Sequence, residues 1–179
     1  MKRLFKKLRL STLRRSQAGF TLVEVLAAVA ITGVIALGAS VSSGQLLNQT
    51  SRDSNITAAS RYAANALYWL SRDALMSQNT TGEAGFPATS TLCLRWTSWD
   101  NVNYSANYTV TDGTLYRTYS AGSAVSTAMI ANFINTSADM TSCVSSDGTI
   151  TITVTSSVGQ GARTVNVTKT RRISNRPDL

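Results

Sequence analysis

The feature that most constrains this chain is an apolar run close to its amino terminus. Residues 20–41 are almost all apolar or small, and Glu24 is the only charged residue among them. A helix of about 20 residues rises about 30 Å, which is enough to cross the hydrocarbon core of a bilayer. We therefore expect a protein anchored in a membrane by one helix.

The positive charge of the chain is concentrated before that run. Seven of the 17 basic residues precede Gly19 without any acidic residue, which leaves 10 basic residues against 9 acidic ones. The rest of the chain is therefore close to neutral and is not a basic protein. Basic residues that flank a membrane helix stay in the cytoplasm, so we expect a cytoplasmic amino terminus and a translocated remainder.

A secretory signal peptide is the alternative interpretation of the same segment. Small residues at Gly38-Ala39-Ser40 would then be the place where a signal peptidase cuts. The apolar run is longer than the usual h-region of about 7–15 residues. A carboxylate in a membrane helix also costs about 2.5–3.5 kcal/mol, so we favour a membrane helix in which Glu24 has a partner.

The residues at the start of the run form a known pattern. A basic leader ends in Gly19, and Phe20-Thr21-Leu22-Val23-Glu24 then opens the apolar segment. In these features the chain resembles the type IV pilin and type II secretion pseudopilin superfamily, and the resemblance covers only the amino-terminal part. It implies a non-enzymatic filament subunit of the inner membrane, with its globular domain on the periplasmic or extracytoplasmic side.

The resemblance implies roles for three residues. A prepilin peptidase would cut between Gly19 and Phe20 and N-methylate the new amine of Phe20. Glu24 would pair with the amino terminus of a neighbouring subunit, because a buried carboxylate and a buried amine neutralise each other. The implied partners are other pilin or pseudopilin subunits, the prepilin peptidase, the pilus or secretion assembly platform and the inner membrane.

Two further features of the run bear on the kind of subunit. Small residues recur along it and would let helices pack closely in lipid, although such residues are also common in any membrane helix. No proline precedes Pro87, whereas many major pilins carry one near the position of Val41. We therefore expect a minor pilin. The segment Leu115-Tyr116-Arg117 resembles a stretch of J-type pseudopilins, which are the alternative.

After the membrane segment the sequence predicts that the helix continues to about Gln78. Apolar or small residues at spacings of three and four form one face, with charged residues such as Asp73 mostly on the other side. The predicted face contains Ile56, Ala59, Ala63, Ala66, Leu67, Leu70 and Ala74. Glycine and proline in residues 79–87 are expected to end the helix.

The remaining sequence is rich in Thr, Ser, Val, Ile and Tyr, which favour strands. Asp112-Gly113 predicts a hairpin turn, and Gly159-Gln160-Gly161 predicts another. The apolar pattern of residues 129–134 is compatible with both a helix and a strand. Residues 80–87 and 121–127 are expected to be exposed loops. The expected fold is α+β: a long amino-terminal helix packed on an antiparallel sheet of four or five strands.

These features predict four parts of the chain. They are a basic leader (1–19) that is removed, a transmembrane and assembly half of the helix (20–47), an amphipathic half (48–78) and a β-rich globular domain (79–179).

Cys93 and Cys143 both lie in the part that we expect to be translocated, where disulfides persist. We expect a bond between them, with two free buried thiols as the alternative. The chain has no His, which removes Ser-His-Asp chemistry and most zinc sites. The loop carboxylates are scattered singly, so we expect no metal, no cofactor and no enzymatic activity.

The last basic residues, Lys169, Arg171, Arg172 and Arg176, have no interleaved aromatic residues. This pattern is typical of a solvated strand edge rather than a DNA site, so DNA is not an expected partner. Four tyrosines are expected to form a cross-strand cluster, namely Tyr104, Tyr108, Tyr116 and Tyr119. A different class remains open: a secreted or membrane-anchored β-rich binding module in which residues 20–41 serve only for export.

Overall fold

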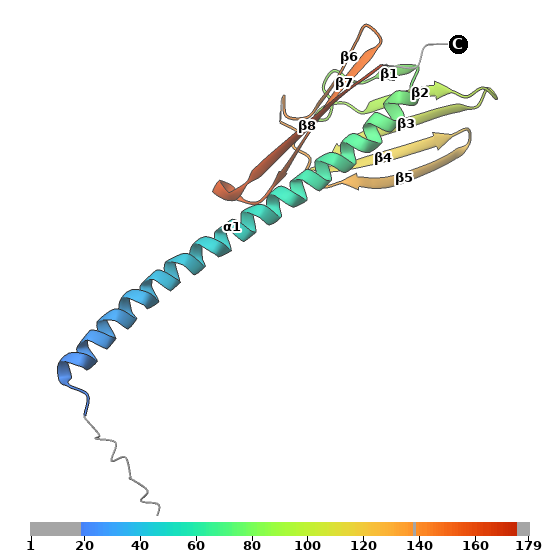
Figure 1. Cartoon of the computed structure of the whole chain (residues 1–179). Coiled ribbons are helices and arrows are strands. Elements are labelled where there is room, and N and C mark those ends of the chain that lie inside the picture. Colours follow the sequence, from blue (N-terminus) through green and yellow to red (C-terminus); the bar gives the residue numbers. More distant parts are fainter. Residues whose placement is uncertain (1–18, 138, 175–179) are drawn as a thin grey trace, which may run out of the picture. The chain divides into compact units, whose positions relative to one another are not determined.

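The computed structural model describes residues 19–137 and 139–174, so the basic leader before Gly19 and Arg176 of the basic tail lie outside the described residues. The chain divides into two compact units, one that ends at Leu46 and one that begins at Leu47. One helix, α1 (Leu22–Met76), contributes residues to both units (Figure 1).

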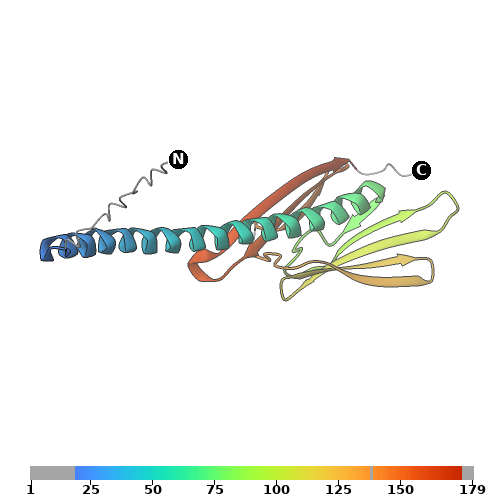
Figure 2. The same ribbon diagram turned by 60° about the horizontal axis from the view of Figure 1, so that its bottom comes forward.

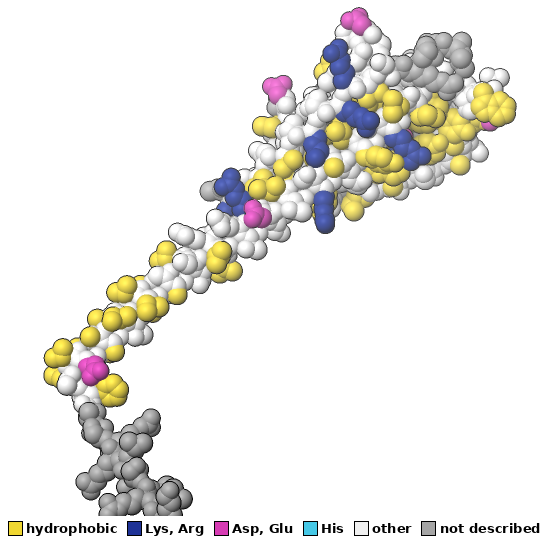
Figure 3. Space-filling view, in the orientation of Figure 1, with side chains coloured by type: hydrophobic (Ala, Val, Ile, Leu, Met, Phe, Trp, Pro, Cys, Tyr) yellow, Lys and Arg dark blue, Asp and Glu magenta, His cyan; other side chains and the backbone are white. Residues whose placement is uncertain are grey.

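The first unit consists, in its described part, of the beginning of α1. Every side chain from Gly19 to Leu46 is exposed, and the most apolar window of the helix has a mean hydropathy of 2.3. Figure 3 shows hydrophobic side chains along this segment. Among the described residues α1 is the one helix long and apolar enough to cross a membrane. An apolar helix that its own chain leaves bare needs lipid or other helices around it.

The second unit holds eight strands in its described residues, arranged in two antiparallel sheets (Figure 2). The first sheet has the order β1-β2-β3-β4-β5. Its strands are β1 (Asn79–Thr81), β2 (Leu92–Thr97), β3 (Asn103–Thr111), β4 (Thr114–Ala121) and β5 (Ala124–Ala131). The second sheet consists of β6 (Ser142–Ser146), β7 (Thr149–Val158) and β8 (Val165–Ser174), and a short 3-10 helix, η1 (Gly161–Arg163), precedes β8.

The predicted α+β class is confirmed, and so is the hairpin at Asp112-Gly113. Both residues have positive φ, +50° and +71°, and Thr111 pairs with Thr114 across the turn. Two successive residues of this conformation match the twist of the flanking strands, and Asp-Gly adopts it readily. Asp147-Gly148 joins β6 to β7 in the same conformation.

The predicted antiparallel sheet of four or five strands is present with five strands, and a second sheet of three strands, which the sequence did not predict, accompanies it. Two predictions about loops of this unit were wrong. Residues 121–127, expected to be a loop, are mostly strand, because β4 and β5 pair directly from Ala121↔Ala124 onward. Residues 79–81, expected only to end the helix, pair with β2. In both cases the partner strand, which local propensity does not reveal, decides the conformation.

One hydrophobic core joins the second half of α1 to both sheets. The predicted helical face is largely confirmed: Ala59, Ala63, Ala66, Leu70 and Ala74 are fully buried. Leu67 is partly buried, whereas Ile56 lies at the border and is 39% exposed. Because most of these residues are alanines, the helix backbone can approach the sheets closely. Leu92, Leu94 and Leu115 of the first sheet and Ile150, Ile152 and Val154 of the second fill the space against them.

Candidate functional site

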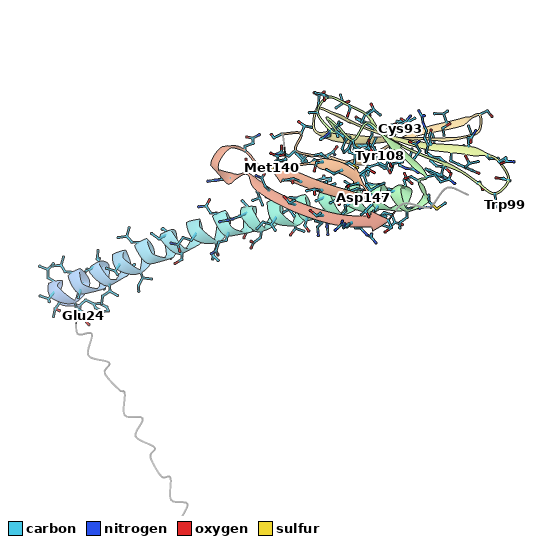
Figure 4. All side chains as sticks on the ribbon, turned by 90° about the horizontal axis from the view of Figure 1, so that it is seen from above. Glu24, Cys93, Trp99, Tyr108, Met140 and Asp147 are labelled. Carbon is cyan, nitrogen blue, oxygen red and sulfur yellow. The ribbon has the colours of Figure 1, made fainter. Side chains whose placement is uncertain are left out.

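The start of α1 is capped by the residues of the predicted motif. Thr21 immediately precedes the helix, and the backbone N–H of Glu24 donates to Thr21 Oγ1 at 3.3 Å and to the Thr21 carbonyl at 3.0 Å. Thr at the cap and Glu three residues later are the sequence signature of a capping box. A carboxylate in the first turn also complements the helix dipole. The motif therefore starts the helix as well as carrying the charge of Glu24 (Figure 4).

A shallow groove runs along one side of this first segment. It has a volume of about 750 Å³ and is lined by Phe20, Glu24, Val25, Ala28, Val29, Thr32, Gly33 and Ala36. Phe20 is 81% exposed at its end, and a Cβ added to Gly33 would meet nothing within 4 Å. The fold of the chain itself therefore does not require small residues here. An apolar groove with one carboxylate at its end suits another helix that brings a cation.

Three hydroxyl groups of the first part of α1 donate to carbonyls of the helix itself. Thr32 Oγ1 donates to the Ala28 carbonyl at 2.7 Å, and Ser40 Oγ and Ser43 Oγ donate to the carbonyls four residues earlier at 2.8 Å each. Such back-bonding lets hydroxyl side chains lie in lipid without an unpaired donor. Glu24 is the one charged residue of residues 20–41.

A long helix with a bare apolar segment, continued into an antiparallel α+β unit, suggests anchoring in a membrane by a single helix. The prokaryotic N-terminal methylation motif matches residues 14–40 of the chain. This segment of the chain thus carries the prepilin-type signal of type IV pilins and pseudopilins. Pilin-type proteins with this motif are structural, and the motif suggests assembly with other pilin subunits and processing by a prepilin peptidase. Comparison with curated proteins and with solved structures gave no match.

A second cluster of polar residues lies inside the β-rich unit, and the sequence prediction placed its central residue wrongly. Asp73 of α1 was assigned mostly to the polar side of the helix, yet its side chain is only 4% exposed. Arg117 Nε and Nη2 donate to the two carboxylate oxygens of Asp73 at 2.6 and 2.9 Å, and Tyr108 Oη donates at 2.5 Å. The bidentate ion pair joins α1 to β4, and the hydrogen bond from Tyr108 joins α1 to β3.

Aromatic rings surround this ion pair. The Arg117 guanidinium lies 4.5 Å from the ring centre of Tyr119 and 5.1 Å from that of Trp69. Burial, together with the charge and the hydrogen bond of Asp73, raises the pKa of Tyr108 above its usual value. Burial alone would lower the pKa of Arg117, but the hydrogen bonds and charge of Asp73 outweigh it and the pKa is raised. The tyrosine therefore stays protonated and the arginine charged, which suits a fixed structural clamp.

The predicted disulfide is not present in the structure. Cys93 and Cys143 are two free, buried cysteines, one on β2 and the other on β6, so the alternative of two buried thiols describes them. Burial, with a smaller contribution from the charge of Glu83, raises the pKa of Cys143 to about 12. A thiol that keeps its proton is a poor nucleophile.

The raised pKa of Cys143 predicts that stability falls in alkaline solution. The thiol ionises near its usual value of 9.0 in the unfolded chain and near about 12 in the folded protein. The folded state thus holds the proton more tightly, and the resulting stabilisation is complete below about pH 9 and is lost as the pH rises toward 12. We expect a loss of about 1 kcal/mol between about pH 8 and about pH 10, measured by denaturant unfolding.

The contribution of Cys143 can be separated from other alkaline effects. Cys143→Ala should flatten the pH dependence over this interval, whereas Ser142→Ala, the neighbouring change on β6, should keep the slope of the unmodified protein. Equal slopes in both variants would contradict the prediction. Tyr108, whose pKa is also raised, acts in the same direction at higher pH.

The predicted cluster of four tyrosines is present only in part. The ring centres of Tyr104 and Tyr119 lie 6.2 Å apart across strands, and Trp96 lies beside both at 5.8 and 6.1 Å. Tyr108 instead belongs to the Asp73 cluster. Arg171 Nη1 of the basic tail donates to Ser71 Oγ at 3.1 Å, so it contacts the helix.

No group of three or more potential metal ligands occurs among the described residues. Trp99, in the turn after β2, is 88% exposed (Figure 4).

Proposed function

We propose that this protein is a minor pilin subunit of a type IV pilus-like filament, assembled through its N-terminal helix after prepilin peptidase processing. The observation that carries the proposal is the methylation motif at residues 14–40, located where a capped apolar helix begins and every side chain is bare. In this proposal the leader (1–19) is removed, residues 20–47 form the membrane and assembly half of the helix, residues 48–78 its amphipathic half, and residues 79–179 the globular domain.

Glu24 is the assembly residue in this proposal. Cleavage between Gly19 and Phe20 creates a new amine, and the Phe20 nitrogen becomes N-methylated and stays cationic. The carboxylate of Glu24 in one subunit then pairs with the amine of Phe20 in another. Within the described residues Glu24 forms no ion pair with its own chain, so pairing with the amine of another subunit would favour association and set the axial register of the helices.

The proposed orientation follows the charge asymmetry of the chain. The basic leader stays in the cytoplasm, and the globular domain lies on the extracytoplasmic side of the inner membrane. Besides other subunits and the peptidase, an assembly platform in the membrane would extract the subunit into the filament. A type II secretion pseudopilin of the J type is the alternative, since it uses the same leader and helix. The lack of a proline before Pro87 supports a minor subunit over a major one.

The first test is the amino terminus of the mature protein. We expect intact-mass measurement and terminal sequencing to find N-methylated Phe20 in cells that contain the prepilin peptidase. Cells without the peptidase should retain the full leader, because no other step removes it. A terminus near Ser40, or an intact leader in peptidase-containing cells, would overturn the proposal and favour a secreted or anchored binding module.

A further inference from the structure

A polar pocket on the β-rich unit has no role in the proposed assembly. It has a volume of about 350 Å³ and is lined by Asn48, Ser51, Arg52, Asn55, Arg163, Thr164 and Val165. The first four belong to α1 and the others to the end of η1 and the start of β8. All of them lie within the second compact unit.

The α1 wall of the pocket is one stripe of the helix. Positions 48, 51, 52 and 55 follow the spacing of three and four that puts side chains on one helical face. Farther along, the same spacing continues through Ala59 and Ala63, which are fully buried in the core. The stripe thus changes from apolar to amide, hydroxyl and guanidinium groups at 48–55. Asn48, Ser51 and Arg52 are exposed and Asn55 is half-buried, so their polar groups are accessible to a ligand.

The opposite wall is a turn of defined geometry. Gly159 has φ +116°, and a Cβ there would lie 2.5 Å from the Arg163 carbonyl oxygen and 3.1 Å from Asn55 Nδ2. The positive φ and the close Arg163 carbonyl oxygen therefore both disfavour a side chain at this position. The backbone N–H groups of Arg163 and Thr164 donate at 3.1 Å to the carbonyls of Gln160 and Gly161. This tight turn presents Arg163 and Thr164 to the α1 stripe.

The charge of the pocket is unbalanced. Two guanidinium groups and no carboxylate are among its lining residues, and Asp53, although next to Arg52 in sequence, does not line it. Within residues 19–137 and 139–174 the one ion pair is Arg117–Asp73, so neither Arg52 nor Arg163 has a carboxylate partner there. Two like charges that share a pocket repel each other, and an anion between them turns that repulsion into attraction.

We propose that this pocket binds a phosphate group. Guanidinium groups match the geometry of phosphate oxygens and make strong, charge-assisted hydrogen bonds with them. The hydroxyls of Ser51 and Thr164 and the amides of Asn48 and Asn55 are further donors for a phosphate that carries three or four oxygens. The pocket follows the apolar segment of α1 in sequence by only a few helical turns, so the phosphate of an anionic lipid headgroup is one source and free phosphate is the other.

Calorimetric titration of the purified full-length protein in neutral detergent micelles tests the proposal. The two probes are inorganic phosphate and a short-chain phosphatidylglycerol. We expect saturable binding of at least one probe, and Arg163→Gln should weaken it about tenfold or more because a charge-assisted contact is lost. Arg61→Gln is the matched control, since Arg61 is an exposed residue of the same helix that does not line the pocket.

The outcomes separate the two sources and the competing explanation. Binding of both probes at similar affinity assigns the site to phosphate itself, and binding of the phospholipid alone assigns it to a lipid headgroup. No saturable binding of either probe would overturn the proposal. So would an equal effect of Arg61→Gln and Arg163→Gln, because that indicates attraction to net charge. Arg52→Gln and Thr164→Val, checked for an unchanged thermal transition, provide independent variants if Arg163→Gln alters the fold.

Discussion

Glu24→Gln is expected to lower the incorporation of the protein into filaments about 100-fold or more. The change keeps the size of the side chain and removes its charge, so in the proposed assembly the amine of Phe20 in the adjacent subunit would lose its partner. Removal of one member of a buried ion pair costs about 3–5 kcal/mol, and about 1.4 kcal/mol corresponds to a factor of ten. The amount of protein in sheared filaments, relative to the amount in membranes, measures this effect.

The control for this experiment is the other glutamate of the chain. Glu83 lies on the β-rich unit, outside the helix, and Glu83→Gln should leave incorporation unchanged. Membrane levels of both variants should match the unmodified protein, because loss of a charge does not hinder insertion of an apolar helix. Normal incorporation of Glu24→Gln would show that another contact sets the register of the helices.

The second large effect is expected at Asp73. Asp73→Ala should destabilise the β-rich unit by about 3–5 kcal/mol, since it leaves a largely buried guanidinium unpaired. In the folded protein the side chain of Arg117 is only 14% exposed, and the Tyr108 hydroxyl would also lose its acceptor. Denaturant unfolding of the full-length protein, followed by tryptophan fluorescence, measures the change, because Trp69 lies beside Arg117.

Two comparisons sharpen this prediction. Asp53→Ala removes an exposed carboxylate from the same helix and should change stability by no more than about 0.5 kcal/mol. The double variant Asp73→Leu/Arg117→Met should recover much of the loss, because an apolar pair of similar size leaves no uncompensated charge. A cost below about 1 kcal/mol for Asp73→Ala would contradict the interpretation of this cluster as a clamp.

The sequence was sufficient for the features that short stretches encode. The membrane segment is a contiguous apolar run, and the residues that cap it, Thr21 and Glu24, lie within one helical turn of each other. The buried face of α1 follows from a repeat of three and four residues, and the Asp112-Gly113 turn follows from two adjacent residues. Each of these signals acts over a few residues, so no knowledge of distant partners is needed.

The predictions that were wrong concern residues whose environment depends on partners far away in the sequence. Asp73 was assigned to the polar side because an isolated carboxylate belongs in water, and only its partner on β4, 44 residues away, makes burial favourable. No local pattern in the sequence singles out Arg117 as that partner. Likewise, residues 124–131 form strand β5 because they pair with the edge of β4.

The order of the amino acids alone is enough to predict a prepilin-type motif, a helix long and apolar enough to cross a membrane, and a β-rich domain. Only the folded chain reveals that the strands form two sheets, that Cys93 and Cys143 are unbonded in the structure and that Arg52 and Arg163 line one pocket. The physical reason is the range of the interactions. Hydrophobic periodicity, capping and turn preferences act between neighbours in the chain, whereas ion pairs, sheet edges and pockets depend on segments that only folding brings together.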